Sequence, residues 1–368
     1  MIPTKAYIGN TQLSAMMLNE VNLLHGDSGG VKDLVLYPCR SYLQNVDYSD
    51  NPEYTITEVY NYINDADGSS AFPKAVTLEF ESATTSVTIY TDEQHTQVQQ
   101  SVTFASATSV DIYNLIPNTN YYWEAGNGES GTFSTRGDVR WCYLQGCNNY
   151  RDLGGKETVD NKVVKYGRLY RGSEMNGEHG YHITESAILV ARNVLGVGAE
   201  LDFRNQGETD NDTPDDYSDD INSSALGDDI PYQKAPILAY SQIATTLTEL
   251  KTAWDFILAQ LRLGHGVCYH CWAGADRTGT ISWLLLGLLK VKTDLMDKDY
   301  ELTSFSRYGS NFNIRKRNDT TNMEFGTFVN DYIKSFTGDT LHEKIENFWL
   351  SIGVTSSEIA EFRMMMRE

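Results

Sequence analysis

The sequence has no apolar stretch long enough to cross a membrane, and its first residues lack the basic start and apolar run of a signal peptide. It is also poor in positive charge: 29 Lys and Arg against 50 Asp and Glu give a net charge of -21. A nucleic-acid-binding protein needs a basic face to displace counterions, so that class is not expected. A cytoplasmic protein and an exported protein whose signal has been removed both fit these observations.

Cysteine is scarce as well. Five cysteines are too few for a disulfide scaffold, and an odd number cannot all pair within one chain. Cys268 and Cys271 form a C-x-x-C pattern, but Cys142 and Cys147 do not supply the matched second pair of a zinc site. We therefore expect no metal and no cofactor. A redox role for the C-x-x-C pattern, or a protective disulfide between Cys268 and Cys271, remains an alternative.

The 368 residues are too many for one small core, and three regions differ in pattern. Residues 1–70 are the least regular, although the run from Val31 to Leu43 is typical of a strand. Residues 71–137 alternate between apolar and polar side chains in short runs, which predicts an all-β sandwich. Residues 138–368 mix apolar runs with helical periodicity, which predicts an α/β domain whose central sheet is flanked by helices. The fold class is therefore multidomain.

Within the third region, Ala199–Phe203 and Gly266–Tyr269 are predicted as buried strands, and Ile243–Leu263 and Thr278–Lys290 as helices. Between them, Glu208–Asp229 holds nine carboxylates and few apolar anchors, so we expect a solvated excursion there.

One stretch carries the chemistry. A short apolar strand ends at His270, and Cys271 and Arg277 follow with five residues between them. Gly274 and Gly279 let the backbone turn, so successive N–H groups and the N-terminus of the next helix can form an anion cradle. An arginine adds a planar fork that holds two phosphate oxygens. The sequence therefore predicts a phosphate-binding loop made of Trp272, Ala273, Gly274, Ala275, Asp276 and Arg277.

Cys271, at the base of this loop, is predicted to be a nucleophile. Positive surroundings favour the thiolate, and a thiolate below a bound phosphate is placed for in-line attack on phosphorus. The alternative is a buried structural cysteine at a strand end. The order of strand, Cys, two glycines, Arg, Thr-Gly and helix favours the phosphate site.

The loop resembles the signature of the protein tyrosine phosphatase superfamily, in which His-Cys is followed by five residues, Arg, and Ser or Thr. The closer resemblance is to the bacterial tyrosine/serine protein phosphatases, which include enzymes with phosphoinositide activity. The resemblance spans about residues 145–365 and includes five further stretches, at Asn149–Gly155, Gly167–Ser173, Asp202–Glu208, Asp299–Thr303 and Gly353–Arg363. The stretch Asn114–Thr135 separately resembles fibronectin type III modules. Such a module would dock a partner or pack on the catalytic domain, and in a bacterial enzyme it favours export.

The resemblance implies roles for individual residues. Cys271 would be the nucleophile and Arg277 the phosphate binder, Thr278 would assist the departing thiolate, and His270 would tune it. Five residues would brace the loop rather than perform chemistry: Arg151, Asp152, Asp202, Arg204 and Glu208.

The general acid is the least determined residue. Many relatives place an acidic residue on a movable loop after a strand, but residues 230–240 contain no Asp. Asp276 is the better candidate, and the alternative is that Asp276 only forms an ion pair with an arginine.

The expected substrate is a phosphorylated protein or a small phosphate monoester. Where the family commonly has Lys this chain has Ala275, which favours phosphotyrosine-like esters over phosphoinositides and inositol phosphates. Trp272 could stack on an aromatic ring at the mouth of the loop or serve packing alone. Two alternative functions remain open: a phosphoinositide or inositol-phosphate phosphatase, and a non-catalytic phosphate-binding protein.

Overall fold

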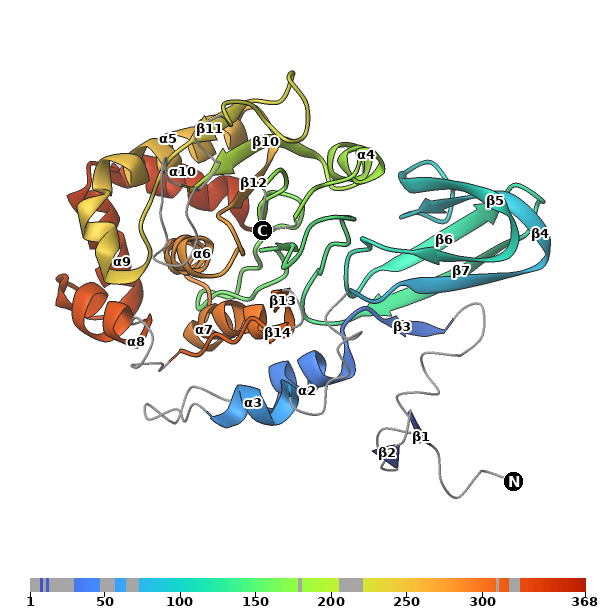
Figure 1. Cartoon of the computed structure of the whole chain (residues 1–368), viewed down its shortest axis with the longest axis horizontal. Coiled ribbons are helices and arrows are strands. Elements are labelled where there is room, and N and C mark those ends of the chain that lie inside the picture. The colour runs from blue at the N-terminus through green and yellow to red at the C-terminus, as the bar shows by residue number, and fades with distance from the viewer. Residues whose placement is uncertain are drawn as a thin grey trace. The chain divides into compact units, whose positions relative to one another are not determined.

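The computed structural model describes residues 7–8, 11–12, 30–46, 57–63, 73–177, 181–204, 221–308, 311–317 and 325–368. These residues form two compact units, each with its own hydrophobic core. Unit 1 takes the described residues of 1–35 and 74–137, and unit 2 takes those of 36–73 and 138–368. Unit 2 thus includes a segment that lies between the two parts of unit 1 in the sequence. Figure 1 labels most helices and strands of both units.

Unit 1 is built on a five-stranded sheet in the order β3-β7-β6-β4-β5. Its strands are β3 (Val31–Asp33), β4 (Val76–Tyr90), β5 (Val98–Ile112), β6 (Asn120–Ala125) and β7 (Ser130–Arg136). β3 runs parallel to β7, and the other neighbours are antiparallel. A separate ladder joins β1 (Tyr7–Ile8) to β2 (Thr11–Gln12).

The alternation predicted for residues 71–137 is confirmed in β4. Val76, Leu78 and Phe80 are buried, whereas Thr77 and Glu79 are exposed. The strand pairing differs from the prediction, because the ladders join these strands in one sheet rather than in two packed sheets. Register shifts interrupt the β4–β5 ladder, and such bulges let long strands bend.

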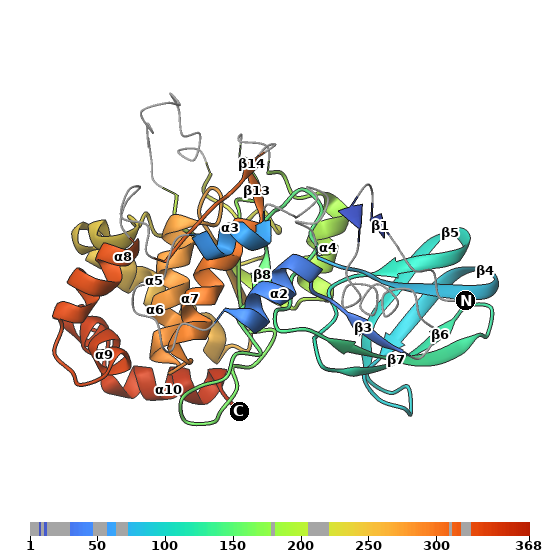
Figure 2. The ribbon, with the colours of Figure 1, turned by 90° about the horizontal axis from the view of Figure 1, so that it is seen from below.

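The run from Val31 to Leu43, predicted as a strand, is extended only at its beginning. After β3 the chain forms helix α2 (Tyr37–Asn45), which has a proline in its first turn. A proline fits there because the N–H groups of the first turn have no intrahelical partner. Helix α3 (Thr57–Ile63) follows α2 in the sequence, and both helices belong to unit 2. Figure 2 labels both helices.

Unit 2 has a five-stranded sheet in the order β11-β10-β12-β9-β8. Four strands are parallel: β9 (Leu169–Gly172), β10 (Val197–Asp202), β11 (Tyr232–Lys234) and β12 (Gly266–His270). The edge strand β8 (Arg151–Asp152) is antiparallel to β9. This sheet with its flanking helices is the α/β architecture that the sequence predicts for residues 138–368.

Different helices cover the two faces of this sheet. On one face, α5 (Leu247–Arg262) and α6 (Asp276–Leu288) pack in the main core together with Val267 and Tyr269 of β12. On the other face, α4 (Glu185–Asn193) shares a second cluster with Cys268. β12 is therefore buried on both faces, which accounts for its continuous apolar sequence.

The remaining elements complete unit 2. They are η3 (Tyr240–Thr245), α7 (Thr293–Glu301), η4 (Leu302–Phe305), β13 (Arg307–Tyr308), β14 (Asn311–Phe312), α8 (Phe325–Thr327), η5 (Phe328–Tyr332), η6 (Ile333–Ser335), α9 (Leu341–Ser351) and α10 (Ser356–Met366). Within the described part of the chain, no helix is both long and apolar enough to cross a membrane.

Candidate active site

The predicted phosphate-binding loop joins β12 to α6. It leaves the central strand after His270 and enters the helix at Asp276, so it lies at the carboxyl edge of the parallel strands, where open α/β sheets bind ligands. Ala275 occupies the N-cap of α6 and makes no side-chain cap hydrogen bond. The first N–H groups of a helix have no intrahelical acceptor, and an anion can take that place.

Carbonyl groups of the loop are held by donors from outside it. The Gly274 oxygen accepts from Asn149 Nδ2 at 2.9 Å and from Arg171 Nη2 at 2.8 Å. The Trp272 oxygen accepts the backbone N–H of Glu174 at 2.8 Å. These bonds turn the two carbonyl groups toward the surrounding protein.

The neighbouring carbonyl groups behave in the same way. The Ala273 oxygen lies 3.4 Å from Asn149 Nδ2, and the Cys271 oxygen lies 3.2 Å from Nδ1 of His270. In a trans peptide the C=O and N–H groups point in opposite directions, and no cis peptide occurs among the described residues. The N–H groups of residues 272–275 therefore face the inside of the loop.

Gly274 is required by two independent features of the loop. Its φ is +66°, a left-handed conformation that favours glycine. A Cβ atom at this position would also lie 2.3 Å from the carbonyl oxygen of Gly172 in β9. The loop can therefore approach β9 this closely only because residue 274 has no side chain.

Cys271 and Thr278 lie at the base of the loop. Cys271 is 4% exposed and packs in the main core. The Thr278 hydroxyl, in the first turns of α6, is buried and has no hydrogen-bond partner among the described residues. A buried hydroxyl without a partner is uncommon, and a thiolate or bound phosphate beside it would supply the missing acceptor.

A buried cluster centred on Asp299 supports the loop from one side. Asp299 pairs with Arg171 at 2.8 Å, with Lys156 at 3.2 Å and with Arg151 at 3.3 Å. Burial opposes the charge of Asp299, but the three cations outweigh it and hold its pKa below the usual range. Because Arg171 also donates to the Gly274 oxygen, Asp299 fixes the orientation of a group that contacts the loop directly.

Arg151 and Asp152, adjacent in β8, have separate roles. Arg151 donates to the side-chain oxygen of Asn149, and so it orients the amide that holds the loop. Asp152 faces away from the loop and accepts from Arg140 at 3.1 Å and from the N–H groups of residues 154 and 167. Asp152 therefore supports the sheet edge rather than the phosphate site.

A second buried network lies behind His270. Nε2 of His270 is 3.0 Å from Glu200, and Nδ1 is 3.9 Å from Asp202. Burial opposes a charged imidazole, but Asp202 and Glu200 outweigh it and raise the pKa of His270. A protonated His270 can donate through both nitrogens, and the Nδ1 donor holds the Cys271 carbonyl in place.

Asp202 and Arg204 extend this network. Arg204 pairs with Asp202 at 2.7 Å and with Glu174 at 3.1 Å. Burial would raise the pKa of Asp202, but His270 and Arg204 lower it to about 2. Glu208, predicted to brace the loop, lies outside the described residues, as does most of the acidic run Glu208–Asp229.

The predicted phosphate binder and general acid are adjacent at the start of α6. Arg277 is partly exposed and donates to the Phe203 carbonyl at 3.2 Å, next to the end of β10. Asp276 accepts two bonds from Arg315, at 2.5 Å and 2.7 Å, and a further bond from the Tyr240 hydroxyl. The ion-pair alternative for Asp276 is thus present, and its partner is an arginine that no sequence motif indicated.

The protective disulfide between Cys268 and Cys271, left open as an alternative, is not formed in the structure. All five cysteines are free thiols. Cys268 belongs to the cluster beneath α4, and Cys271 belongs to the main core on the other face of the sheet. Successive side chains of a strand point to opposite faces, so the C-x-x-C spacing does not bring these two sulfur atoms together.

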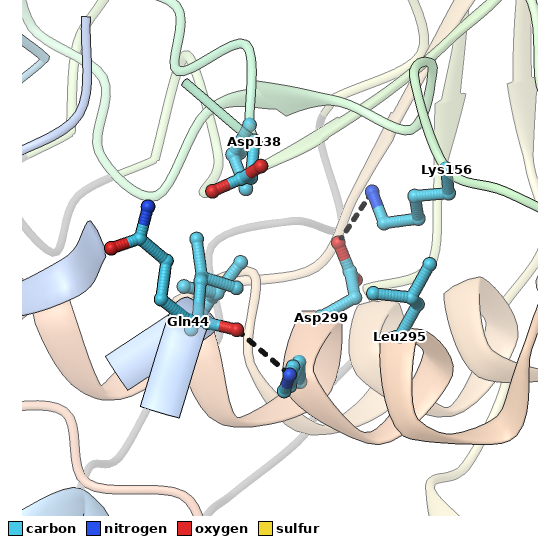
Figure 3. A pocket seen from close by; sticks show the side chains of 9 residues that line it. Gln44, Asp138, Lys156, Leu295 and Asp299 are labelled. Atoms are coloured by element: carbon cyan, nitrogen blue, oxygen red, sulfur yellow. Dashed lines mark hydrogen bonds and ion pairs between the residues drawn. The ribbon is translucent and has the colours of Figure 1, made fainter. Parts of the chain in front are cut away.

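A cavity of 240 Å³ lies behind the Asp299 cluster and does not include the Cys271 loop. Figure 3 shows Lys156 pointing to Asp299 on one side of it, with Gln44 of α2 and Asp138 on the other. Lys298 closes the cavity floor by donating to the Leu43 carbonyl at 2.8 Å. The cavity is lined by residues of α2 and of the Asp299 cluster, and none of the predicted catalytic groups is among its lining residues.

Sequence reasoning assigned no role to several residues that hold the loop. The motifs quoted for the family resemblance contain four of them: Asn149, Arg171, Asp299 and Thr303. The sequence thus marked these residues, but it did not show that they contact the loop. Glu200 had no such signal, because a carboxylate inside a buried strand becomes interpretable only when its histidine partner is seen.

Comparison with known proteins shows the family of this chain. A model of the tyrosine phosphatase family matches residues 142–368, more than half of the chain, and the chain therefore belongs to that family. The chain is also similar to a protein of Cupriavidus necator named "Putative tyrosine-protein phosphatase H16_A0669", with 28% identity over 171 residues. That alignment covers 40% of this chain and 57% of the relative, so the chain spans less than two thirds of the relative's length.

Proposed function

We propose that the chain is a phosphatase that hydrolyses phosphate monoesters through a phosphocysteine on Cys271. The observation that carries this proposal is the set of hydrogen bonds that hold the loop carbonyls outward, from which an inward direction follows for the N–H groups of residues 272–275. These groups and Arg277 would bind the phosphoryl oxygens above Cys271. Membership of the tyrosine phosphatase family supports the same reaction.

The reaction would proceed in two steps. In the first, the Cys271 thiolate attacks phosphorus, the S–P bond forms, and the ester P–O bond breaks with its electron pair on the leaving oxygen. In the second, water attacks phosphorus and the thiolate leaves, with the Thr278 hydroxyl as its hydrogen-bond donor. The N–H groups and Arg277 stabilise the charge on the equatorial oxygens in both steps.

The substrate we propose is phosphotyrosine in a protein or peptide. Ala275 is fully buried at the N-cap of α6 and brings no cation to the rim of the loop, which disfavours polyanionic phosphoinositides. Trp272 is partly exposed and follows Cys271 in the sequence, so its ring is the side chain that we propose to stack on a phenyl ring. The name of the Cupriavidus relative also specifies tyrosine-protein phosphatase.

We propose that the sheet of unit 1 is a fibronectin type III-like module, a docking surface rather than part of the active site. Its support is Tyr121, whose hydroxyl accepts the Ile116 N–H at 2.8 Å. A tyrosine hydroxyl bonded to backbone a few residues upstream is the tyrosine corner of immunoglobulin-like sandwiches.

The direct test is Cys271→Ser. We expect this variant to keep the circular dichroism spectrum of the wild type and to lose hydrolysis of aryl phosphates. Wild-type enzyme quenched during turnover should carry one phosphoryl group on the peptide containing Cys271, detected by mass spectrometry. Vanadate should inhibit and chelators should not. Wild-type rates in Cys271→Ser would reject the phosphocysteine mechanism.

A further inference from the structure

The cavity behind the Asp299 cluster, here called the rear cavity, has the size and the lining of a ligand site. Its volume is 240 Å³, whereas an apolar cavity of about 150 Å³ already holds a benzene molecule. The walls are apolar and are formed by Leu43, Val139, Leu295 and Leu302. A ligand with an aromatic or short aliphatic body therefore fits between these walls.

A buried cation lines the inner end of the rear cavity. The Lys156 side chain is 6% exposed, and its ammonium nitrogen lies 3.2 Å from Asp299 and 3.4 Å from the Leu153 carbonyl oxygen. An ammonium group has three hydrogens to donate, so these two acceptors, which are the ones that the described residues provide, leave one hydrogen available. A carboxylate in the cavity would accept it in a charge-assisted hydrogen bond.

The charges around the inner end favour one further anion. The carboxylate of Asp299 pairs with three cations, which are Arg151, Arg171 and Lys156. Burial lowers the pKa of Lys156, and Arg151 adds to this effect, although Asp299 opposes it. A second anion beside Lys156 would stabilise its charged form.

The outer end of the rear cavity limits the ligand to one negative charge. Gln44 and Asp138 line this end, and both are exposed, on the side opposite Lys156 and Asp299 in Figure 3. A phosphate monoester carries nearly two negative charges near neutral pH, since its second pKa is about 6, and Asp138 would repel the additional charge. The cavity therefore suits a monocarboxylate and is not a second site for the phosphate substrate.

The cation that would hold this ligand is linked to the phosphate loop. Lys156 pairs with Asp299, which also pairs with Arg171 at 2.8 Å. Arg171 in turn donates to the Gly274 carbonyl oxygen at 2.8 Å. A ligand carboxylate adds negative charge to cations that lie beside the loop, and an oxyanion in the loop depends on the same positive surroundings. Two anions that share these cations oppose each other, so each should weaken the binding of the other.

We propose that the rear cavity is an effector site for a small monocarboxylate with an apolar body, and that its occupant weakens oxyanion binding at the Cys271 loop. The second part rests on the proposed phosphatase function, whereas the first part is independent of it. Such a site would let the enzyme respond to the concentration of a carboxylate that does not enter the loop.

The first part is tested by titrating the full chain with 4-fluorobenzoate and following the fluorine NMR signal of this probe. Wild type should bind it saturably, and should bind the neutral 4-fluorobenzamide about tenfold more weakly or worse, because the amide brings no charge to Lys156. Lys156→Met should weaken 4-fluorobenzoate binding by a similar factor. Leu295→Trp, which fills the cavity and leaves Lys156 in place, should abolish it. The control Lys251→Met removes the same charge from an exposed ion pair with Asp255 and should bind like wild type.

Three results would overturn the effector site: no saturable binding to wild type, wild-type affinity in a folded Lys156→Met or Leu295→Trp variant, and equal affinity for the benzoate and the benzamide. Circular dichroism establishes that each variant is folded. Because Lys156 also supports Asp299, Lys156→Met could fail to fold, and Leu295→Trp then decides the question without changing any charge.

The second part is tested with vanadate, whose binding is measured by calorimetry at a series of 4-fluorobenzoate concentrations. The vanadate dissociation constant should rise to a plateau about fivefold or more above its starting value, because the effect ends when the separate site is full. A rise without a plateau would place the probe in the loop itself, and an unchanged constant would show that the two sites are independent; either result overturns the coupling. Absence of vanadate binding would count against the proposed function, and the probe titrations would still decide the cavity.

Discussion

The side-chain amide of Asn149 donates to the carbonyl oxygen of Gly274 at 2.9 Å and thereby holds one edge of the phosphate loop from a segment far upstream in the sequence. Asn149 itself has a left-handed backbone, with φ at +54°, which Asn tolerates better than other residues with a Cβ.

Asn149→Ala should therefore lower kcat/KM about tenfold or more, since loss of a buried hydrogen bond of about 1–3 kcal/mol would loosen the loop. The matched control is Asn161→Ala. Asn161 also has a positive φ, +58°, but is exposed and remote from the loop. Asn161→Ala should lower the free energy of unfolding through the same backbone strain as Asn149→Ala and keep wild-type kinetics. Equal kinetic losses in both variants would contradict the role given to Asn149.

Gly274→Ala should abolish activity. The added Cβ would meet the Gly172 oxygen, so the loop must move away from β9 and the inward N–H groups lose their alignment. Gly196→Ala separates this clash from backbone strain, because Gly196 also has a left-handed φ, +71°, but has open space around its Cβ. Gly196→Ala should show only the backbone strain, which lowers the free energy of unfolding by about 1–2 kcal/mol and leaves kcat unchanged. Activity retained in Gly274→Ala would show that the approach to β9 is dispensable.

Asp202 should make stability sensitive to acid. Its pKa is lowered to about 2 in the folded protein, so the stability it contributes is present above its unfolded pKa and is lost as pH falls toward the folded value. The difference in unfolding free energy between wild type and Asp202→Asn should shrink by roughly 2 kcal/mol over that interval. Urea unfolding at a series of acidic pH values measures it.

The control for this prediction is Asp229→Asn, which removes the carboxylate of an exposed ion pair with Arg192. An exposed pair contributes little, so this variant should follow wild type at every pH. A constant gap between wild type and Asp202→Asn over the acidic range would contradict the prediction.

Tyr42→Phe should destabilise unit 2 although Tyr42 lies far upstream of residues 138–368. The Tyr42 hydroxyl donates to Glu301 at 2.5 Å, and both side chains are buried. Removing the donor should lower the unfolding free energy by about 1–3 kcal/mol. Tyr90→Phe in unit 1, where the ring stacks on His95, should leave the unfolding of unit 2 unchanged. If Tyr42→Phe is equally neutral, the hydrogen bond from Tyr42 to Glu301 contributes nothing to the stability of unit 2.

The strand, loop and helix around Cys271 could be predicted because their information is local. Val267 and Tyr269 are apolar, Gly274 permits the turn, and α6 follows at once, so neighbours in sequence determine the geometry. The helix α2 could not be separated from β3, because apolar residues are spaced similarly in short strands and helices. The pairing of β4 with β5 and β6 also depends on contacts that no alternation pattern specifies.

The candidate site divides in the same way. Cys271, Arg277 and Thr278 follow from spacing within one loop, whereas Asn149 and Arg315 act through contacts between distant segments. The Arg315–Asp276 ion pair could not be foreseen, because it depends on the hydrogen bond from the Arg315 N–H to Ser304, which holds residues 311–317 in place. The charge of a residue can be read from the sequence, but its ion-pair partner cannot.

The chain passes from unit 1 into unit 2 at residues 35 and 36, returns at 73 and 74, and passes over again at 137 and 138. The two bodies are therefore joined by three crossings of the backbone. A protease that cleaves the chain once, after Gly137, would leave two fragments that stay associated in solution. The shorter fragment retains α2, whose Tyr42 hydroxyl donates to Glu301 in the longer fragment. Deleting the first 137 residues would instead remove α2, a helix that belongs to unit 2.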